Sequence, residues 1–235
     1  MEKLFLTAAA AATLSFVSLG AYAADEGAFI GINGGQTHYG ISNTGFQDKK
    51  DSAFGALVGY RWAVDRPFYI GVEGGYVDLG KISSAYDRTE TTISRSLTIT
   101  SDFHDKYELK GRALLFGANG KWVLPHHWTI TARLGLAHSR SKYDHDATVN
   151  VDNAYVLHDA ASIYVKHVTY VEHASSRATS TDNGIYAGVG FGYDFTEHFG
   201  VSLNYDNYSL KAQNITNDKR TVNVGVWGGS AEVRF

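Results

Sequence analysis

Charged side chains recur on alternate positions of several glycine-rich segments of the chain. These charged residues share the polar phase of their segments with glycines. They are Glu73, Lys121, Arg133, Glu232 and Arg234. Opposite charges withdrawn from water attract strongly but are stable only when they are paired. We therefore expect ion pairing, with Glu73 bonded to Lys121, Arg133 or Arg234. Such a network would either fill the inside of a protein or, if water followed the charges, act as an ion gate.

A second group of cations follows a different phase. Arg112 and Arg140 fall on the apolar phase at the outer ends of two alternating segments. Lys110 precedes Arg112 by two positions, and Lys142 follows Arg140 by two. Guanidinium groups bind phosphates through two parallel hydrogen bonds, so the phosphates of lipopolysaccharide are the expected partners. The alternative is that these long side chains simply extend past an apolar surface to water.

Catalytic and metal sites are not indicated. His138 beside Ser139 or Ser141 is the nearest approach to a base next to a nucleophile, and no suitably spaced acid accompanies it. The histidines have no metal-site spacing with carboxylates, and the chain contains no cysteine. We predict no catalytic residues, no metal and no cofactor.

The elements that carry these residues alternate in polarity with a period of two. The terminal segment is typical: Trp227, Val233 and Phe235 share one phase, whereas Glu232 and Arg234 share the other. Eight such segments occur, at 29–39, 52–64, 70–76, 108–124, 130–136, 185–195, 201–206 and 226–235. Strands can satisfy every backbone group in lipid only when they form a closed barrel. The pattern predicts an all-β fold, an eight-stranded antiparallel up-and-down transmembrane β-barrel, whose narrow interior favours structural pairing over a gate.

Short and long connections alternate along the chain. Aromatic rings cluster beside the short turns and the C-terminus, as a belt at a membrane interface would, at Tyr60, Trp62, Phe68, Tyr69, Trp122, Trp128, Tyr193, Phe195, Phe199 and Phe235. The short turns are therefore expected to face the periplasm. The extended extracellular loops are expected at 40–51, 81–107, 141–183 and 209–220.

Two of these loops contain further patterning. Residues 93–100 still alternate, which predicts strands that continue above the membrane as a raised surface. The alternative is that 141–183 inserts as a further hairpin and gives ten strands. The charged residues Lys166, His167 and Glu172 lie on both phases, which argues against lipid contact.

The ends and the composition set the compartment. Residues 1–23 have a short charged start, an apolar run and Ala21-Tyr22-Ala23, which predicts a signal peptide followed by a barrel domain at 24–235. Export to the cell outer membrane follows. The net charge of −3 gives no general attraction to nucleic acid, and we expect a monomer.

The strand segments resemble the OmpA-like family of small outer-membrane barrels. The resemblance rests on residues 69–76 with Leu79-Gly80-Lys81, on Lys121 and Arg133-Leu134-Gly135, and on the terminal Glu232-Val233-Arg234-Phe235. It implies a luminal Glu73 facing basic residues. Asn204 stands where the family usually has a second luminal glutamate. We expect no peptidoglycan-binding domain after Phe235, as in the short OmpX and Opa types.

The function expected from these features is structural, with surface interaction (adhesion or envelope integrity) through the long loops. The alternative is a narrow porin-like diffusion channel. Expected partners are outer membrane lipids and lipopolysaccharide, a host or surface ligand at the loops, and the barrel-assembly machinery, which would contact the C-terminal strand ending in Phe235.

Overall fold

The computed structural model describes residues 26–40, 50–159, 162–213 and 219–235. The predicted signal peptide at 1–23 lies outside the described residues. No helix in the described part of the chain has the length and apolar character to cross a membrane.

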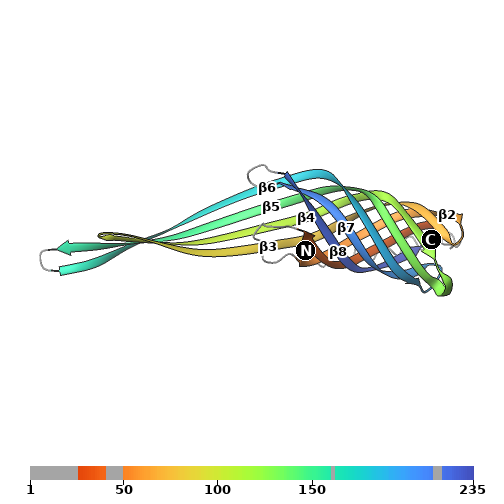
Figure 1. Cartoon of the computed structure of the whole chain (residues 1–235), viewed down its shortest axis with the longest axis horizontal. Coiled ribbons are helices and arrows are strands. Elements are labelled where there is room, and N and C mark those ends of the chain that lie inside the picture. The colour runs from red at the N-terminus through yellow and green to blue at the C-terminus, as the bar shows by residue number, and fades with distance from the viewer. Residues whose placement is uncertain (1–25, 41–49, 160–161, 214–218) are drawn as a thin grey trace.

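Eight antiparallel strands close into a barrel, as the alternation predicts (Figure 1). In chain order they are β1 Gly27–Gly40, β2 Lys50–Asp65, β3 Phe68–Ser94, β4 Leu97–Val123, β5 Trp128–Asp159, β6 Ser162–Asp194, β7 Phe199–Gln213 and β8 Lys219–Arg234. Each strand pairs with the next, and β8 pairs with β1 from Phe29↔Arg234 to Gly40↔Asn223. Closure leaves no open sheet edge within the barrel wall.

The barrel wall is apolar outside and polar inside. Phe116, Leu203 and Trp227 are 67 %, 74 % and 68 % exposed, whereas Glu73, Lys121 and Arg234 are buried. Water would disfavour so large a continuous apolar surface, but lipid favours it. The period of two places every second side chain on each surface, which explains why the phase could be predicted.

The predicted aromatic belt is present, with one correction. Trp62, Trp122 and Phe195 are exposed beside the short connections, whereas Tyr69 is only 5 % exposed and points inward. Tyr69 is next to the exposed Ile70 in β3, and adjacent side chains of a strand face opposite sides, so Tyr69 faces the lumen. The connection after β4 is a short 3-10 turn, Pro125–His127.

Four strands continue far beyond the barrel, as the alternation at 93–100 predicts. We call this projection the blade and define it as residues 81–94, 97–110, 142–159 and 162–179 of β3 to β6 (Figure 1). Residues 81–107 and most of 141–183 are therefore strand rather than loop. The ten-strand alternative is wrong, because β5 and β6 pair with each other up to Asp159↔Ser162 as continuations of barrel strands.

Candidate functional site

The luminal charges form bonded groups at successive levels of the barrel. Nearest the short turns, the Asp194 carboxylate accepts hydrogen bonds from Lys121 Nζ at 2.7 Å and from Arg234 Nη1 at 2.8 Å. Lys121 and Arg234 are each 2 % exposed. A carboxylate shared by two cations in this position compensates charges that burial alone would strongly disfavour.

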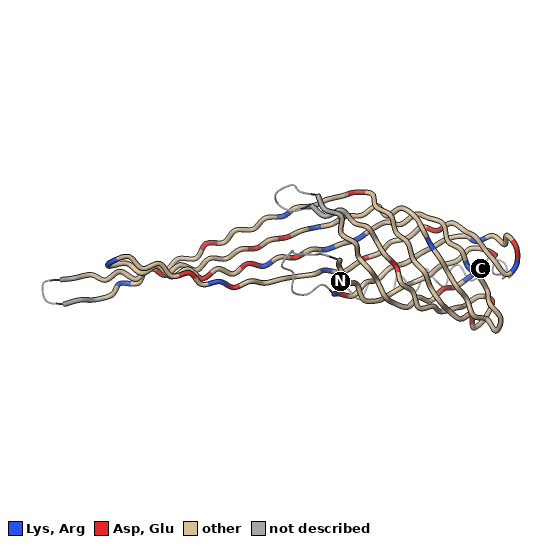
Figure 2. The backbone as a smooth tube through the Cα atoms, in the orientation of Figure 1, with Lys and Arg blue, Asp and Glu red and all other residues tan. Residues whose placement is uncertain are grey.

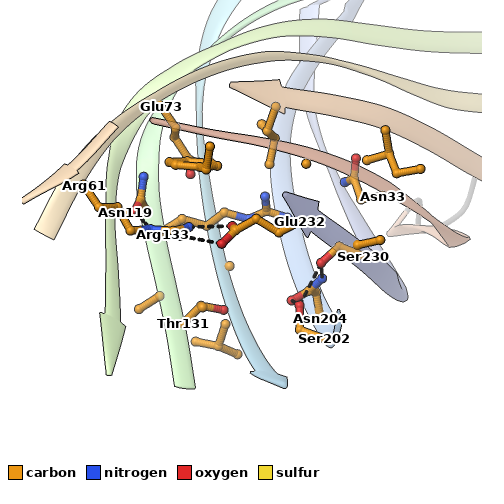
Figure 3. A pocket seen from close by; sticks show the side chains of 18 residues that line it. Asn33, Arg61, Glu73, Asn119, Thr131, Arg133, Ser202, Asn204, Ser230 and Glu232 are labelled. Carbon is orange, nitrogen blue, oxygen red and sulfur yellow. Dashed lines mark hydrogen bonds and ion pairs between the residues drawn. The ribbon is translucent and has the colours of Figure 1, made fainter. Parts of the chain in front are cut away.

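The next level centres on Arg61. Its Nη1 and Nη2 donate to the two carboxylate oxygens of Glu232 at 2.7 and 2.8 Å, and its Nε donates to Asn119 Oδ1 at 2.7 Å (Figure 3). The guanidinium also lies 4.0 Å from the centre of the Phe29 ring. This fork geometry holds the arginine over the luminal face of β1, between β2 and β8.

The third level contains Glu73 and Arg133. Arg133 Nε donates to Asp206 Oδ1 at 2.7 Å and its Nη2 donates to Asp206 Oδ2, whereas Glu73 Oε1 accepts a hydrogen bond from Tyr186 Oη at 2.7 Å. The partners differ from those expected: Tyr186 bonds Glu73, and Asp206 bonds Arg133.

A small internal cavity lies between these levels. It measures about 50 Å³ and is lined by Asn33, Arg61, Glu73 and Arg133 among others (Figure 3). Asn33 Oδ1 has no hydrogen-bond partner among the described residues. A polar cavity of this size has room for a few water molecules, but it is too small for a solute path.

Above the charges the lumen is closed by a hydrophobic plug. We define the plug as Tyr39, Val77, Leu79, Ile82, Leu109, Tyr186, Tyr208, Leu210 and Val224, all 5 % exposed or less. The Tyr186 and Tyr208 rings stack with their centres 6.1 Å apart. The plug lies above the charged levels and reaches the base of the blade, to which Ile82 and Leu109 belong.

Several partners in the network were not singled out from the sequence, among them Arg61, Asp206 and Tyr186. Arg61 and Asp206 fall on the inward phase of their strands, so alternation was the signal that could have found them. Which residues meet across the lumen depends on strand stagger, which alternation does not specify. Asn204 stands apart from the ion pairs and donates to Ser230 Oγ at 2.8 Å.

The structure brings the four predicted surface cations together at the junction of barrel and blade. Arg112 is opposite Arg140, and Lys110 is opposite Lys142, on adjacent strands β4 and β5. They line an open groove of about 500 Å³, which Asp51, Asp78, Lys81 and Arg177 also line. We call it the basic groove.

Carboxylates balance part of the basic groove. Hydrogen bonds from Lys106 and Lys110 lower the pKa of Glu108, and hydrogen bonds from Arg177 and Lys142 lower the pKa of Asp144. Neither Arg112 nor Arg140 forms an ion pair within the part of the chain that the structure describes. Figure 2 shows that charged residues of both signs recur along the blade strands, whereas long stretches of the barrel strands have none.

The histidine and serine of the catalytic alternative lie apart. His138 is exposed and bonds Asn183 Oδ1 through Nδ1 at 2.7 Å, whereas Ser139 is buried and donates to the Asp182 carbonyl at 3.1 Å. Adjacent strand residues face opposite sides, so the two groups cannot form a base–nucleophile pair. Within the described ranges no three His, Asp or Glu side chains group as metal ligands.

A closed eight-stranded barrel with an apolar outer wall and a filled polar interior defines an integral β-barrel protein of the outer membrane. The chain matches the outer membrane protein beta-barrel domain over residues 9–235 and belongs to that family.

Solved structures similar to this chain are small outer membrane barrels. Ail, the attachment invasion locus protein of Yersinia pestis, in complex with the heparin analogue sucrose octasulfate, is 18 % identical, with a TM-score of 0.42, over 89 % of this chain and 99 % of Ail. OprG of Pseudomonas aeruginosa is 12 % identical, with a TM-score of 0.41, over 90 % and 98 %. Neisserial surface protein A is 10 % identical, with a TM-score of 0.42, over 88 % and 97 %. No curated protein matches the sequence.

Proposed function

We propose that this protein is a surface-interaction protein in which the barrel is the anchor and the blade is the binding element. The observation that carries the proposal is the continuation of four barrel strands into one projecting sheet (Figure 1). A rigid sheet holds side chains in fixed positions at a distance from the membrane, as binding loops on scaffolds do.

The blade exposes apolar side chains as well as charges. Ile93, Val168, Tyr170 and Val171 are 76 %, 41 %, 46 % and 54 % exposed. The last three are close together on β6, and exposed apolar side chains that cluster beside polar ones are typical of protein interaction sites. The blade therefore offers both contact area and charge to a partner.

A blade-shortened variant tests this proposal. Replacing 86–105 and 147–174 each by Asn-Gly joins residues that are already paired, Ala85↔Lys106 and Asp146↔Ser175. Fluorescent cells carrying either chain are applied to plates coated with serum proteins, a sulfated polysaccharide or a neutral polysaccharide. Cells with the intact chain should be retained on at least one coating and cells with the shortened chain should not. Equal retention on every coating would contradict the proposal.

The diffusion-channel alternative has less support. The plug and the bonded charge levels fill the lumen, and the cavity lined by Glu73 and Arg133 holds only a few waters. We expect pure protein in planar bilayers to give no conductance steps. Reproducible steps that a Glu73→Gln variant alters would favour the channel.

The basic groove supports a second interaction, with lipopolysaccharide phosphates. Arg112 lies one outward-facing position above the exposed Leu114, and Arg140 lies two above the exposed Leu136, where the apolar wall ends and charged residues begin. The variant Arg112→Glu/Arg140→Glu should co-purify with less lipopolysaccharide, whereas Arg95→Glu, in the turn between β3 and β4, should not change the amount. Equal amounts in all three preparations would leave these cations as side chains that merely extend to water.

A further inference from the structure

One edge of the blade is open and carries a self-complementary sequence. β6 pairs with β5 along its whole length, but its pairing with β7 covers only Tyr186 to Asp194. No described residue pairs with the other edge of β6 from Ser162 to Ile185. Such an edge presents unpaired backbone N–H and C=O groups to any strand that can lie beside it.

We infer that the β6 edge binds the same edge of a second copy of this chain in antiparallel register centred on Thr169. In this register Lys166 lies opposite Glu172 of the second copy, and Val168 lies opposite Tyr170. Twofold symmetry repeats both contacts. The result is an apolar centre of Val168 and Tyr170 side chains with an ion pair on each side, all on one face of a continuous sheet.

The local contacts of these residues agree with this register. Lys166, Val168, Tyr170 and Glu172 alternate along β6, so they share one face, and Val168 and Tyr170 are 41 % and 46 % exposed. Among the described residues, neither Lys166 nor Glu172 forms an ion pair. Their charges are therefore available to a partner.

The other open edge of the blade is less suited to self-pairing. On β3, Arg88 already bonds Glu90 at 3.4 Å and lies 4.7 Å from the centre of the Phe103 ring. Pairing through these charges would compete with contacts that the chain makes alone.

Antiparallel pairing also sets the relation between the two barrels. β6 runs from the tip of the blade toward its own membrane, so the antiparallel β6 of a second copy runs away from the first membrane and toward a second one (Figure 1). The two barrels must then lie in facing membranes, about 80 Å apart if the 12 residues between Thr169 and Thr181 are counted on each side at 3.3 Å each. Two copies in one membrane would present β6 edges in parallel, related by a twofold axis along the strands, which puts their Lys166 and Glu172 side chains on opposite faces, so the ion pairs could not form.

The inferred activity is therefore homophilic tethering of two membrane surfaces. It rests on the proposed function in so far as the blade must project outside the cell. It goes further by naming the partner, the strand and the register.

A charge-swap experiment tests the register. The full chain is reconstituted in phosphatidylcholine vesicles, and tethering is followed as the initial rate of increase in light scattering. Wild-type vesicles should tether. Lys166→Glu vesicles alone and Glu172→Lys vesicles alone should tether about ten-fold more slowly, because each variant replaces two ion pairs by two like-charge pairs.

An equal mixture of the two variants, at the same total vesicle concentration, should recover to about half of the wild-type rate, because half of the encounters then join unlike vesicles. The glutamate introduced at position 166 of one variant then faces the lysine introduced at position 172 of the other, and the native Glu172 of the first faces the native Lys166 of the second. The variant Glu90→Lys makes the same charge change as Glu172→Lys on the β3 edge and should tether at the wild-type rate. Protease sensitivity of the blade on the vesicles serves as the check that each variant is folded and exposed.

The outcomes are distinct. Failure of wild-type vesicles to tether, or of the mixed variants to recover, would overturn the inference. Loss of tethering in Glu90→Lys would place the contact on the β3 edge and would also overturn it. Neither result would affect the proposed function, which falls only if the intact and shortened chains behave alike on every coated surface.

Discussion

At the scale of single residues, the lumen is a set of matched charges in a space with little room for water to solvate them. Asp194 bonds two cations, and Arg61 and Arg133 each bond one carboxylate. Burying a pair costs solvation of both ions, but removing one member leaves the other buried without compensation. The stability of the barrel should therefore be more sensitive to breaking a pair than to most wall substitutions.

Asp194 gives the sharpest test of this sensitivity. Asp194→Asn keeps the shape but removes the charge that faces Lys121 and Arg234, so we expect the free energy of unfolding to fall by about 3 kcal/mol. Urea unfolding in lipid vesicles measures the change. Glu197→Gln, on an exposed residue three positions away, should have no measurable effect. Equal stability of Asp194→Asn and the native chain would show that the cations find other partners.

Luminal glycines provide the space for the large side chains. A methyl group at Gly135 would lie 2.6 Å from Tyr186 Cε1 and 2.6 Å from the backbone Cα of Gly117, and the backbone atom cannot yield. Gly135→Ala should reduce the free energy of unfolding by about 1 to 3 kcal/mol and loosen the Tyr186 contact with Glu73. At Gly229 the nearest atom is 3.7 Å away, so Gly229→Ala is the matched control. Destabilisation of both variants alike would point to backbone propensity instead.

The sequence predicts which charged residues face the lumen, but not which of them bond to each other. Alternation identifies Glu73, Lys121 and Arg133 as residues of one phase, because lipid and lumen differ so strongly that each strand must obey the period. The same argument cannot tell that Glu73 bonds Tyr186. Partners in the lumen come from strands that are not hydrogen-bonded neighbours in the sheet, and their relative height depends on the stagger of the whole barrel.

At the scale of elements, the strands are longer than their apolar patterns. β4 begins at Leu97, whereas the apolar pattern indicates a start near Glu108. Above the membrane both faces of the blade meet water, so the contrast between phases that marks a strand in lipid weakens. The pairing continues because long β-rich segments extend the ladder already formed below, as the pattern at 93–100 indicated in advance.

Acidic groups at the base of the blade make it sensitive to pH. Hydrogen bonds from lysines and an arginine lower the pKa of Glu108 and of Asp144. Both carboxylates therefore stabilise the folded blade when the pH is above the ordinary pKa of a carboxyl group. That contribution is lost as the pH falls through the lowered folded values, below about pH 4. Below that pH, hydrogen–deuterium exchange corrected for its intrinsic pH dependence should show less protection of residues 106–110 and 142–146.

A paired variant assigns this pH effect to its groups. Glu108→Gln/Asp144→Asn cannot titrate at these positions, so its protection should change little between about pH 6 and about pH 3.5, although it should be lower at the higher pH than in the native chain. A native blade whose protection stays constant over this range would contradict the assignment.

At the scale of the whole molecule, barrel and blade share four strands but have separate sources of stability. The charge levels and most of the plug lie within the barrel, whereas the blade above Ser84 depends on strand pairing and on exposed ion pairs that contribute little each. The two parts should therefore respond independently to substitutions, and the blade should open first when the molecule is stressed.

The blade-shortened chain tests this independence directly. Joining Ala85 to Lys106 and Asp146 to Ser175 through Asn-Gly turns keeps Ile82, Leu109 and the plug they belong to, so the barrel loses none of its buried contacts. The shortened chain should keep the heat-dependent shift in gel mobility of a folded barrel and should unfold in urea within about 1 kcal/mol of the native chain, as changes outside packed regions do. It should also fail to tether vesicles. A shortened chain that no longer folds would mean that the long hairpins guide closure of the barrel, and the blade would then be part of its folding machinery as well as its binding element.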